Sequence, residues 1–179
     1  QNLILADVQE DNLFDLWEKA KSKNLATPNV GLLTDIVCCP GGDFCSLANA
    51  KSIPIAESIQ EVFEDMDYLH DIGEIDLNIS GCMNACGHHH VGHIGILGVD
   101  KDGSEWYQVT LGGNQGNFAS IGKVIGPSFS AEEMPAVITK IIGTYTAQRH
   151  LDESFIDCVV RIGLEPFKVS VYGAKEVKS

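Results

Sequence analysis

Arginine is scarce in this chain, and basic residues are outnumbered by acidic ones. The 179 residues include 12 Lys and Arg against 25 Asp and Glu, so the formal net charge at pH 7 is −13. The only arginines are Arg149 and Arg161. Proteins that bind nucleic acids or anionic membrane surfaces use clustered basic side chains, and the sequence has no basic stripe. The composition therefore excludes both kinds of partner.

Long apolar runs and a secretion signal are also lacking. No uninterrupted run approaches the roughly 20 residues that span a bilayer. Residues 1–25 lack the charged, apolar and small-residue segments of a signal peptide. The 44% of hydrophobic residues is enough for a substantial core, so we expect a folded, cytoplasmic protein. Because the chain begins with Gln1 rather than Met, we also expect it to be part of a longer protein.

Helical and strand-like apolar patterns alternate without a regular strand-helix-strand repeat, which predicts an α+β fold with a mixed sheet packed with helices. Residues 100–103 predict a hairpin turn, and Pro40 to Gly42 predicts a turn that continues neither a strand nor a helix. Pro54 is expected to interrupt a helix that begins near Ser46, and the acidic residues 65–74 are expected to form a solvated connection. Helices are predicted over residues 13–23, 55–66, 130–145 and 155–164, and strands over 3–8, 31–39, 75–79, 94–99 and 106–111.

Cysteines provide the strongest chemical signal. Two pairs lie in short loops that follow predicted strands: five residues separate Cys39 from Cys45, and three separate Cys82 from Cys86. Clustered cysteines in a chain without a secretion signal bind metal or do chemistry more often than they form disulfides. Gly-rich loops can also offer N–H groups to thiolate and sulfide sulfur. The pairs therefore indicate a metal site.

Three interpretations of the cysteine spacing stay open. Tetrahedral zinc also uses four thiolates, but its paired ligands are usually separated by about two to four residues, fewer than the gap after Cys39. An iron–sulfur cluster is larger than a single ion and tolerates wider loops. Structural thiols are the third interpretation. The spacing favours a cluster over zinc, and zinc over structural thiols.

The ordered motifs resemble those of the siroheme-containing nitrite and sulfite reductase family, over roughly residues 27–170. The combination is far more specific than either cysteine pair alone. Its parts are Cys39-Pro-Gly-Gly-Asp-Phe-Cys45, Ser80-Gly81-Cys82-Met-Asn84-Ala-Cys86-Gly87, Ile94-Gly95 and Leu111-Gly112-Gly113-Asn114.

The resemblance implies that four thiolates hold a [4Fe-4S] cluster and that Cys86 also bridges to the iron of siroheme. A shared thiolate couples the two cofactors electronically, so single electrons can reach a substrate on the opposite face of the haem. The implied reaction reduces sulfite to sulfide or nitrite to ammonia with six electrons. A four-cysteine zinc-stabilised domain and a stand-alone [4Fe-4S] electron carrier are the alternatives. The implied cluster ligands are Cys39, Cys45, Cys82 and Cys86.

Further residues are expected near the siroheme, by resemblance or by position. We expect His88 to line the cofactor, although a solvated loop explains the run His88 to His90 equally well, and direct metal ligation of this run is less favoured. Hydrogen bonding within its own turn is the alternative explanation for Asn84. Cys38 and Cys158 are expected to pack in the core. The expected cofactor-binding residues are Thr34, Asn84, Cys86, His88, Gly112, Gly113 and Asn114.

The resemblance also implies what the chain lacks. Siroheme carries several carboxylates and its substrates are oxyanions, so a working site needs converging basic side chains. Family members take these mainly from the N-terminal half of the protein, which we expect to precede this chain. Residues 1–26 resemble the tail of a ferredoxin-like half-domain, and residues 27–179 the cluster- and siroheme-binding domain. The expected partners are therefore that N-terminal half, sulfite or nitrite, and a ferredoxin or flavoprotein electron donor. Without that half, the chain is expected to lack turnover.

Overall fold

The computed structural model describes residues 4–173, which belong to two compact units that divide between Val30 and Gly31. In the first unit, a short 3-10 turn, Glu10–Asn12, leads into helix α1, Leu13–Lys21. Residues 4–8 are irregular, so the expected strand is wrong over the part that is described, whereas Leu3 lies outside it. Their apolar side chains Ile4 and Leu5 are exposed. The reason is that a strand needs a neighbouring strand for its hydrogen bonds, and this unit offers none among its described residues.

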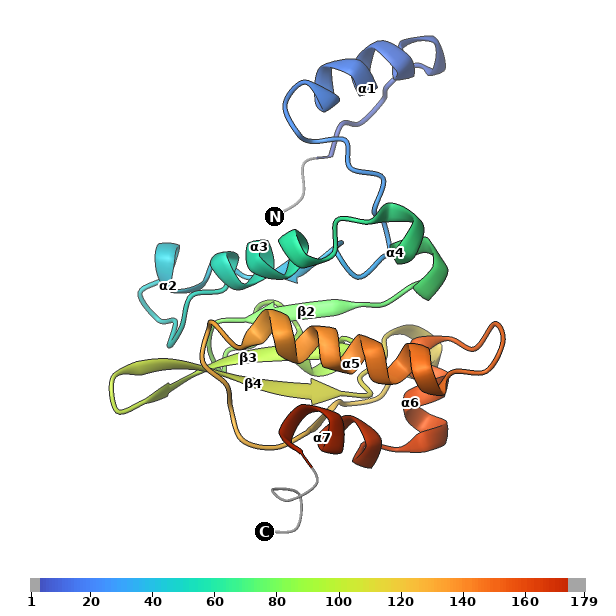
Figure 1. Ribbon diagram of the computed structural model, residues 1–179. Coiled ribbons are helices and arrows are strands. Elements are labelled where there is room, and N and C mark those ends of the chain that lie inside the picture. Colours follow the sequence, from blue (N-terminus) through green and yellow to red (C-terminus); the bar gives the residue numbers. More distant parts are fainter. Residues whose placement is uncertain (1–3, 174–179) are drawn as a thin grey trace. The chain divides into compact units, whose positions relative to one another are not determined.

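The second unit contains a five-stranded mixed sheet in the order β1-β2-β3-β4-β5 (Figure 1). Strands β1, β2 and β3 are parallel, and β4 and β5 continue the sheet antiparallel. Asp102 and Gly103, both with positive φ, form the two-residue turn between β3 and β4. The hairpin and the α+β class are confirmed. The strands are β1 (Val37–Cys38), β2 (Leu77–Ser80), β3 (Ile94–Lys101), β4 (Ser104–Leu111) and β5 (Lys123–Val124).

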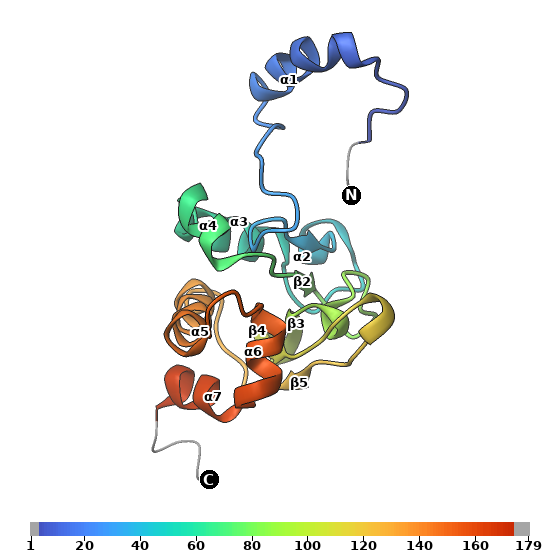
Figure 2. The same ribbon diagram turned by 90° about the vertical axis from the view of Figure 1, so that its right-hand side faces the viewer.

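Helices gather on one side of this sheet, where Figure 2 shows α3, α4 and α5 together. Branched apolar side chains of β2, β3 and β4 are buried there with Ile138, Ile141 and Phe155. None of the helices in residues 4–173 is long and apolar enough to cross a membrane. The helices of this unit are α2 (Gly41–Phe44), α3 (Ile53–Val62), α4 (Met66–Ile72), α5 (Met134–Gln148), α6 (Phe155–Ile162) and α7 (Glu165–Tyr172), and the 3-10 turns are η2 (His89–Val91) and η3 (Gly116–Phe118).

Strand β1 ends at Cys38, before Pro40, so the expected end of the strand is confirmed, and the short helix α2 begins at Gly41. Two other local predictions are wrong for identifiable reasons. Pro54 lies in the first turn of α3 rather than interrupting a helix, because the first N–H groups of a helix have no partner within it. The acidic segment 65–74 contains α4, whose Leu69 and Ile72 are buried and whose start is capped by the Asp65 carboxylate. In that segment, apolar spacing outweighs charge.

The opposite face of the sheet carries small and polar residues. Side chains alternate along a strand, so Asn78, Ser80, Gly95 and Thr110 share the face that does not meet the helices. The segment 81–93, which connects β2 to the parallel strand β3, packs its backbone on this face. Gly95 permits this contact, because a Cβ there would stand 1.9 Å from the His89 carbonyl oxygen. The sheet thus separates a helical core from a face covered by the second cysteine loop and its continuation.

Candidate functional site

The two cysteine loops begin at the carboxyl ends of neighbouring parallel strands. Cys39 directly follows β1, and Gly81 directly follows β2. The backbone N–H of Cys39 donates to the Ile79 carbonyl over 3.1 Å, which continues the pairing of the strands. The Gly81 N–H then donates to Cys39 Sγ over 3.1 Å. The fold therefore places the Cys39 thiol beside the residue that precedes Cys82.

The four thiols differ in exposure. Cys39 and Cys82 are buried, with 6% and 7% of their surface exposed, Cys45 is half-buried, and Cys86 is exposed. Helix α2 fixes Cys45, whose N–H donates to the Gly41 carbonyl over 2.9 Å. Within residues 4–173, no three His, Cys, Asp or Glu side chains lie close enough together to hold a single metal ion. The loops are thus adjacent without forming a tetrahedral single-ion site.

Close backbone packing holds these loops together. A Cβ on Gly81 would stand 2.6 Å from the Ala50 carbonyl oxygen, and one on Gly87 would stand 2.0 Å from the Ile79 carbonyl oxygen. Real Cβ atoms do not approach backbone atoms so closely. The Gly81 carbonyl accepts hydrogen bonds from the N–H groups of Asn49 and Ala50. Glycine on both sides of the Cys82–Cys86 turn therefore lets that turn lie directly against the strand end and the first loop.

Two polar groups contact the sulfur of Cys39. Besides the Gly81 N–H, the Ser52 hydroxyl lies 3.4 Å from Cys39 Sγ. Ser52 immediately precedes α3, so the partial positive charge at the start of that helix is close to the same sulfur. The Lys51 ammonium lies 3.5 Å from Asp43, so it is shared with a carboxylate. Stabilisation of the sulfur thus comes from neutral dipoles.

Cys38 and Cys158, by contrast, are packing residues, as expected. The Cys38 thiol donates to the Cys39 carbonyl over 3.2 Å and packs against the core. Burial raises the pKa of Cys38 to about 12, with smaller contributions from Cys39 and Glu57. Cys158 is fully buried within the core of the helices. Both thiols therefore remain protonated or inert at neutral pH.

The histidine run lies on the connection that crosses the polar face of the sheet. His88 is exposed in the left-handed region, with φ of 53°, and its carbonyl accepts from Asn78 Nδ2. His89 is buried, and burial together with His90 lowers its pKa. Among the described residues, His89 Nδ1 and Asn78 Oδ1 have no hydrogen-bond partner. These two polar atoms are buried on the side of the sheet that the cysteine connection covers.

His93 has a structural role at the end of this connection. Its Nδ1 accepts the Asp76 N–H over 3.1 Å, and its Nε2 lies 3.9 Å from Asp76 Oδ2. The ring also stacks on Phe155, with centroids 6.4 Å apart. His93 thus ties the starts of β2 and β3 together.

The glycine loop after β4 lies against the histidine connection. The Gly112 N–H donates to the His93 carbonyl over 3.1 Å, and a Cβ on Gly113 would stand 2.3 Å from the Gly92 carbonyl oxygen. Asn114 pairs its backbone with Ser120. Gly112 to Asn114 and the segment that follows His88 are therefore neighbours in space, although the sequence separates them.

Thr34 and Asn84 are placed differently. Thr34 is buried before β1, and its carbonyl accepts from Gln60 Nε2 over 2.9 Å. It thus lies at the other end of β1 from Cys39. Asn84 is exposed on the Cys82–Cys86 turn, which is closed by a bond from the Ala85 N–H to the Cys82 carbonyl. The structure brings Asn84, and not Thr34, to the cysteine loops.

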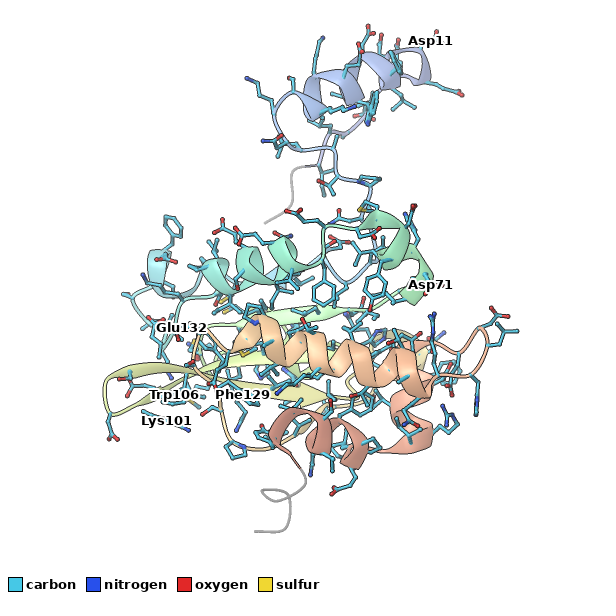
Figure 3. All side chains as sticks on the ribbon, viewed as in Figure 1. Asp11, Asp71, Lys101, Trp106, Phe129 and Glu132 are labelled. Atoms are coloured by element: carbon cyan, nitrogen blue, oxygen red, sulfur yellow. The ribbon has the colours of Figure 1, made fainter. Side chains whose placement is uncertain are left out.

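Both arginines form ion pairs away from the cysteine loops. Arg149 Nη2 lies 2.7 Å from Asp71 Oδ2, and Arg161 Nε lies 2.6 Å from Glu153 Oε1. Asp71 lies at the end of α4, just before β2, whereas Cys82 and Cys86 follow the other end of that strand. Figure 3 shows Asp71 at the side of the unit opposite to α2. Arg161 Nη2 lies 3.7 Å from the packing residue Cys158, and both arginines are held by carboxylates rather than by the cysteines of the two loops.

Sequence reasoning missed Ser52 and Gly81 as hydrogen-bonding partners of Cys39. Gly81 was visible only as part of a strand-ending motif. Ser52 precedes an Ile53-Pro54 helix start and resembles an ordinary helix cap in sequence. The unusual feature, its contact with a sulfur 13 residues earlier, depends on tertiary structure.

The chain is similar to known proteins in sequence and in fold. The family model described as "Nitrite and sulphite reductase 4Fe-4S domain" matches residues 31–178. An assimilatory ferredoxin-dependent nitrite reductase of Haloferax mediterranei is 29% identical over 161 residues, which are 87% of this chain and 27% of that protein. A sulfite reductase [NADPH] hemoprotein beta-component of Yersinia pestis is 27% identical over 167 residues, 92% of this chain and 28% of that protein. The chain thus spans little more than a quarter of these relatives.

A solved structure shares the fold. The NirA protein of Mycobacterium tuberculosis superposes with a TM-score of 0.75 at 24% identity, covering 90% of this chain and 31% of that one. Because the family model covers most of the chain, the assignment does not depend on any single relative. The chain belongs to the family of nitrite and sulphite reductase 4Fe-4S domains.

Proposed function

We propose that this chain is the cluster-bearing region of a siroheme-dependent reductase that converts sulfite to sulfide or nitrite to ammonia. One observation carries the proposal: the loops holding the two cysteine pairs leave adjacent parallel strands and touch through the Gly81 N–H and Cys39 Sγ. This juxtaposition occurs within the family match. The names of the relatives include both nitrite and sulfite reductases, which supports the reaction class without choosing the substrate.

The residues present fit a [4Fe-4S] cluster. The proposed ligands are Cys39, Cys45, Cys82 and Cys86, two of them buried and all on short loops. Donors already point at the Cys39 sulfur, as a bound thiolate requires. The zinc interpretation gains no support, because no three candidate ligands in the described part of the chain converge on one ion.

Cys86 is the proposed shared ligand of the cluster and the siroheme iron, because it is the exposed member of the set. When bound, the two cofactors would pass on electrons from the external donor and supply the iron centre for the six-electron reduction. The chain's own residues hold and shield them. His88 and the loop from Gly112 to Asn114 are proposed to line the macrocycle, beside the polar atoms of Asn78 and His89 that have no protein partner. Thr34 and Asn84 complete the proposed cofactor-binding set, although Thr34 lies apart.

The remaining parts of the site are proposed to come from other segments. Siroheme carboxylates and an oxyanion substrate need basic partners, and both arginines here are held by carboxylates. We therefore assign the basic residues to the N-terminal half of the same protein, and residues 1–26 to the end of that half. The electron donor is a ferredoxin or a flavoprotein, consistent with relatives named for ferredoxin and for NADPH.

Anaerobic reconstitution tests the cluster. The purified chain is treated with iron and sulfide, and bound iron, zinc and acid-labile sulfide are measured together with visible absorbance. We expect about four iron and four sulfide per chain. Changing Cys39, Cys45 or Cys82 to Ala should abolish stable uptake, whereas the matched variants Cys38→Ala and Cys158→Ala should retain it. Stoichiometric zinc without sulfide would contradict the proposal.

The siroheme assignment needs the longer protein. In a holoenzyme that contains this region, Cys86→Ser should separate the spectroscopic signals of cluster and haem, because the shared ligand is altered. Unchanged magnetic coupling would reject the bridging role of Cys86. Steady-state assays with sulfite and nitrite on the same preparation would then identify the preferred substrate.

A further inference from the structure

Ser52 occupies the position of a helix cap without acting as one. It precedes α3, yet its side chain forms no hydrogen bond with the first turn of that helix. Its backbone has φ of −115° and ψ of −40°, in the helical region, whereas a capping serine usually has extended backbone. The hydroxyl is therefore directed elsewhere. The neighbouring helix α4 provides the contrast, because Asp65 is extended and caps two N–H groups.

The Ser52 hydroxyl instead points at the Cys39 sulfur. Ser52 is fully buried, and its Oγ lies 3.4 Å from Cys39 Sγ, which is its hydrogen-bond partner within residues 4–173. A buried hydroxyl needs such a partner, because leaving it unpaired costs about 1–3 kcal/mol. Two glycines make room for this contact: a Cβ on Gly41 would stand 2.8 Å from Ser52 Oγ, and one on Gly81 would stand 2.9 Å from it. The contact is thus built into three segments of the fold.

We propose that Ser52 is a positioning residue that raises the reduction potential of the cluster through a hydrogen bond to the Cys39 thiolate. This inference rests on the proposed function, because it requires Cys39 to ligate iron. As a ligand the sulfur has no proton, so the serine must donate. Together with the Gly81 N–H, the hydroxyl gives Cys39 two donors at a site with little water.

The direction of the effect follows from charge. One-electron reduction adds a negative charge to the cluster and its thiolates, and a donor to sulfur stabilises the more negative state. Burial strengthens the effect, because solvent does not screen it. Removing the donor should therefore lower the potential. We expect a roughly tenfold change in the reduction equilibrium, which corresponds to about 59 mV for one electron.

The test compares variants of the reconstituted 179-residue chain in an anaerobic redox titration followed by electron paramagnetic resonance. Ser52→Ala removes the donor and should lower the midpoint potential, whereas Ser52→Thr keeps a hydroxyl and should stay close to the wild type. Ser58→Ala is the matched control, because Ser58 lies on the same helix and bonds the Ile55 carbonyl rather than a sulfur. A midpoint potential of Ser52→Ala equal to that of Ser58→Ala would overturn the proposal.

Two further readouts keep the result decisive. Where Ser52→Ala does not fold, Ser52→Gly is a second donor-free variant, since glycine is well tolerated at the start of a helix. Resonance Raman spectra of the wild-type chain in H₂O and D₂O should show an isotope shift of the iron–thiolate stretch that is reduced in a donor-free variant. An undiminished shift would reject the hydrogen bond. A wild-type chain that binds no iron and sulfide would instead refute the proposed function itself.

Discussion

The connection from β2 to β3 lies so close to the sheet that Gly95 has no room for a side chain. A Cβ at this position would stand 1.9 Å from the His89 carbonyl oxygen and 2.3 Å from Thr110 Oγ1. Thr110 can rotate, but the His89 carbonyl belongs to a backbone that is held on both sides, by Asn78 Nδ2 at the His88 carbonyl and by the Gly122 N–H at the His90 carbonyl. The change Gly95→Ala must therefore displace the connection that carries Cys86 and the histidine run.

The expected cost can be worked out from its parts. Overpacking against a backbone group costs about 3 kcal/mol, the upper end of the usual range. Alanine also restricts the unfolded chain, which returns about 0.4–1 kcal/mol. The free energy of unfolding should thus fall by about 2 kcal/mol and Tm by about 4–8 °C, given about 2–4 °C per kcal/mol for a chain of this size.

Urea and thermal unfolding of the chain without cofactors measure this effect, with Gly143→Ala as the matched control. A Cβ at Gly143, on the exposed side of α5, meets no atom of the described residues within 4 Å. Alanine in a helix interior should stabilise by about 1 kcal/mol relative to glycine. The same substitution is thus expected to have opposite signs at the two positions. If Gly95→Ala were as stable as Gly143→Ala, the packing of the connection on the sheet would be refuted.

Two further perturbations test other parts of the fold. Asp65→Ala should destabilise by about 1 kcal/mol in urea unfolding, because the carboxylate caps the N–H groups of Asp67 and Tyr68; an unchanged midpoint would contradict that cap. The Arg161 guanidinium lowers the pKa of Glu153 from 4.5 to about 2. Because the folded pKa lies below the unfolded one, this stabilisation is complete above pH 4.5 and is lost as the pH falls towards 2. Glu153→Gln should therefore flatten the unfolding free energy over that pH window, and a profile parallel to the wild type would argue against the ion pair.

Elements defined by local residues were predictable from the sequence. Asp102 and Gly103 accept positive φ, so the hairpin followed from turn chemistry. The apolar spacing in α5 was long enough to identify a helix without tertiary information. The same spacing over Met66, Leu69 and Ile72 in α4 was shorter and surrounded by acidic residues, so charge concealed it. Short helices on the surface of a core are where local patterns carry least information.

The two cysteine loops could be identified from the sequence, whereas their surroundings could not. Cysteine spacing and turn residues identified two loops, and only the pairing of β1 with β2 brings them together. The roles of Ser52, Gly87 and Gly95 depend on approaches between segments that are distant along the chain or on opposite sides of a turn. A serine before a helix predicts a cap, because its side-chain oxygen can accept a hydrogen bond from the first turn. The contact of Ser52 with a sulfur cannot be read from the sequence. Close approach to another backbone is equally invisible at a glycine within a strand.

In a chain with a net charge of −13, the positions of the two arginines determine whether their positive charges are available to an anionic ligand. Arg149 and Arg161 neutralise Asp71 and Glu153, and both of these carboxylates would lose their partners if the arginines turned towards a ligand. At the cysteine loops, an N–H group, a hydroxyl and the start of α3 provide only neutral dipoles. Such dipoles can stabilise thiolates without adding net charge, but a polycarboxylate macrocycle and an oxyanion also need full positive charges. The proposed function therefore implies that this chain would hold the sulfur ligands of the cluster and that another segment would supply the cationic groups that bind the substrate.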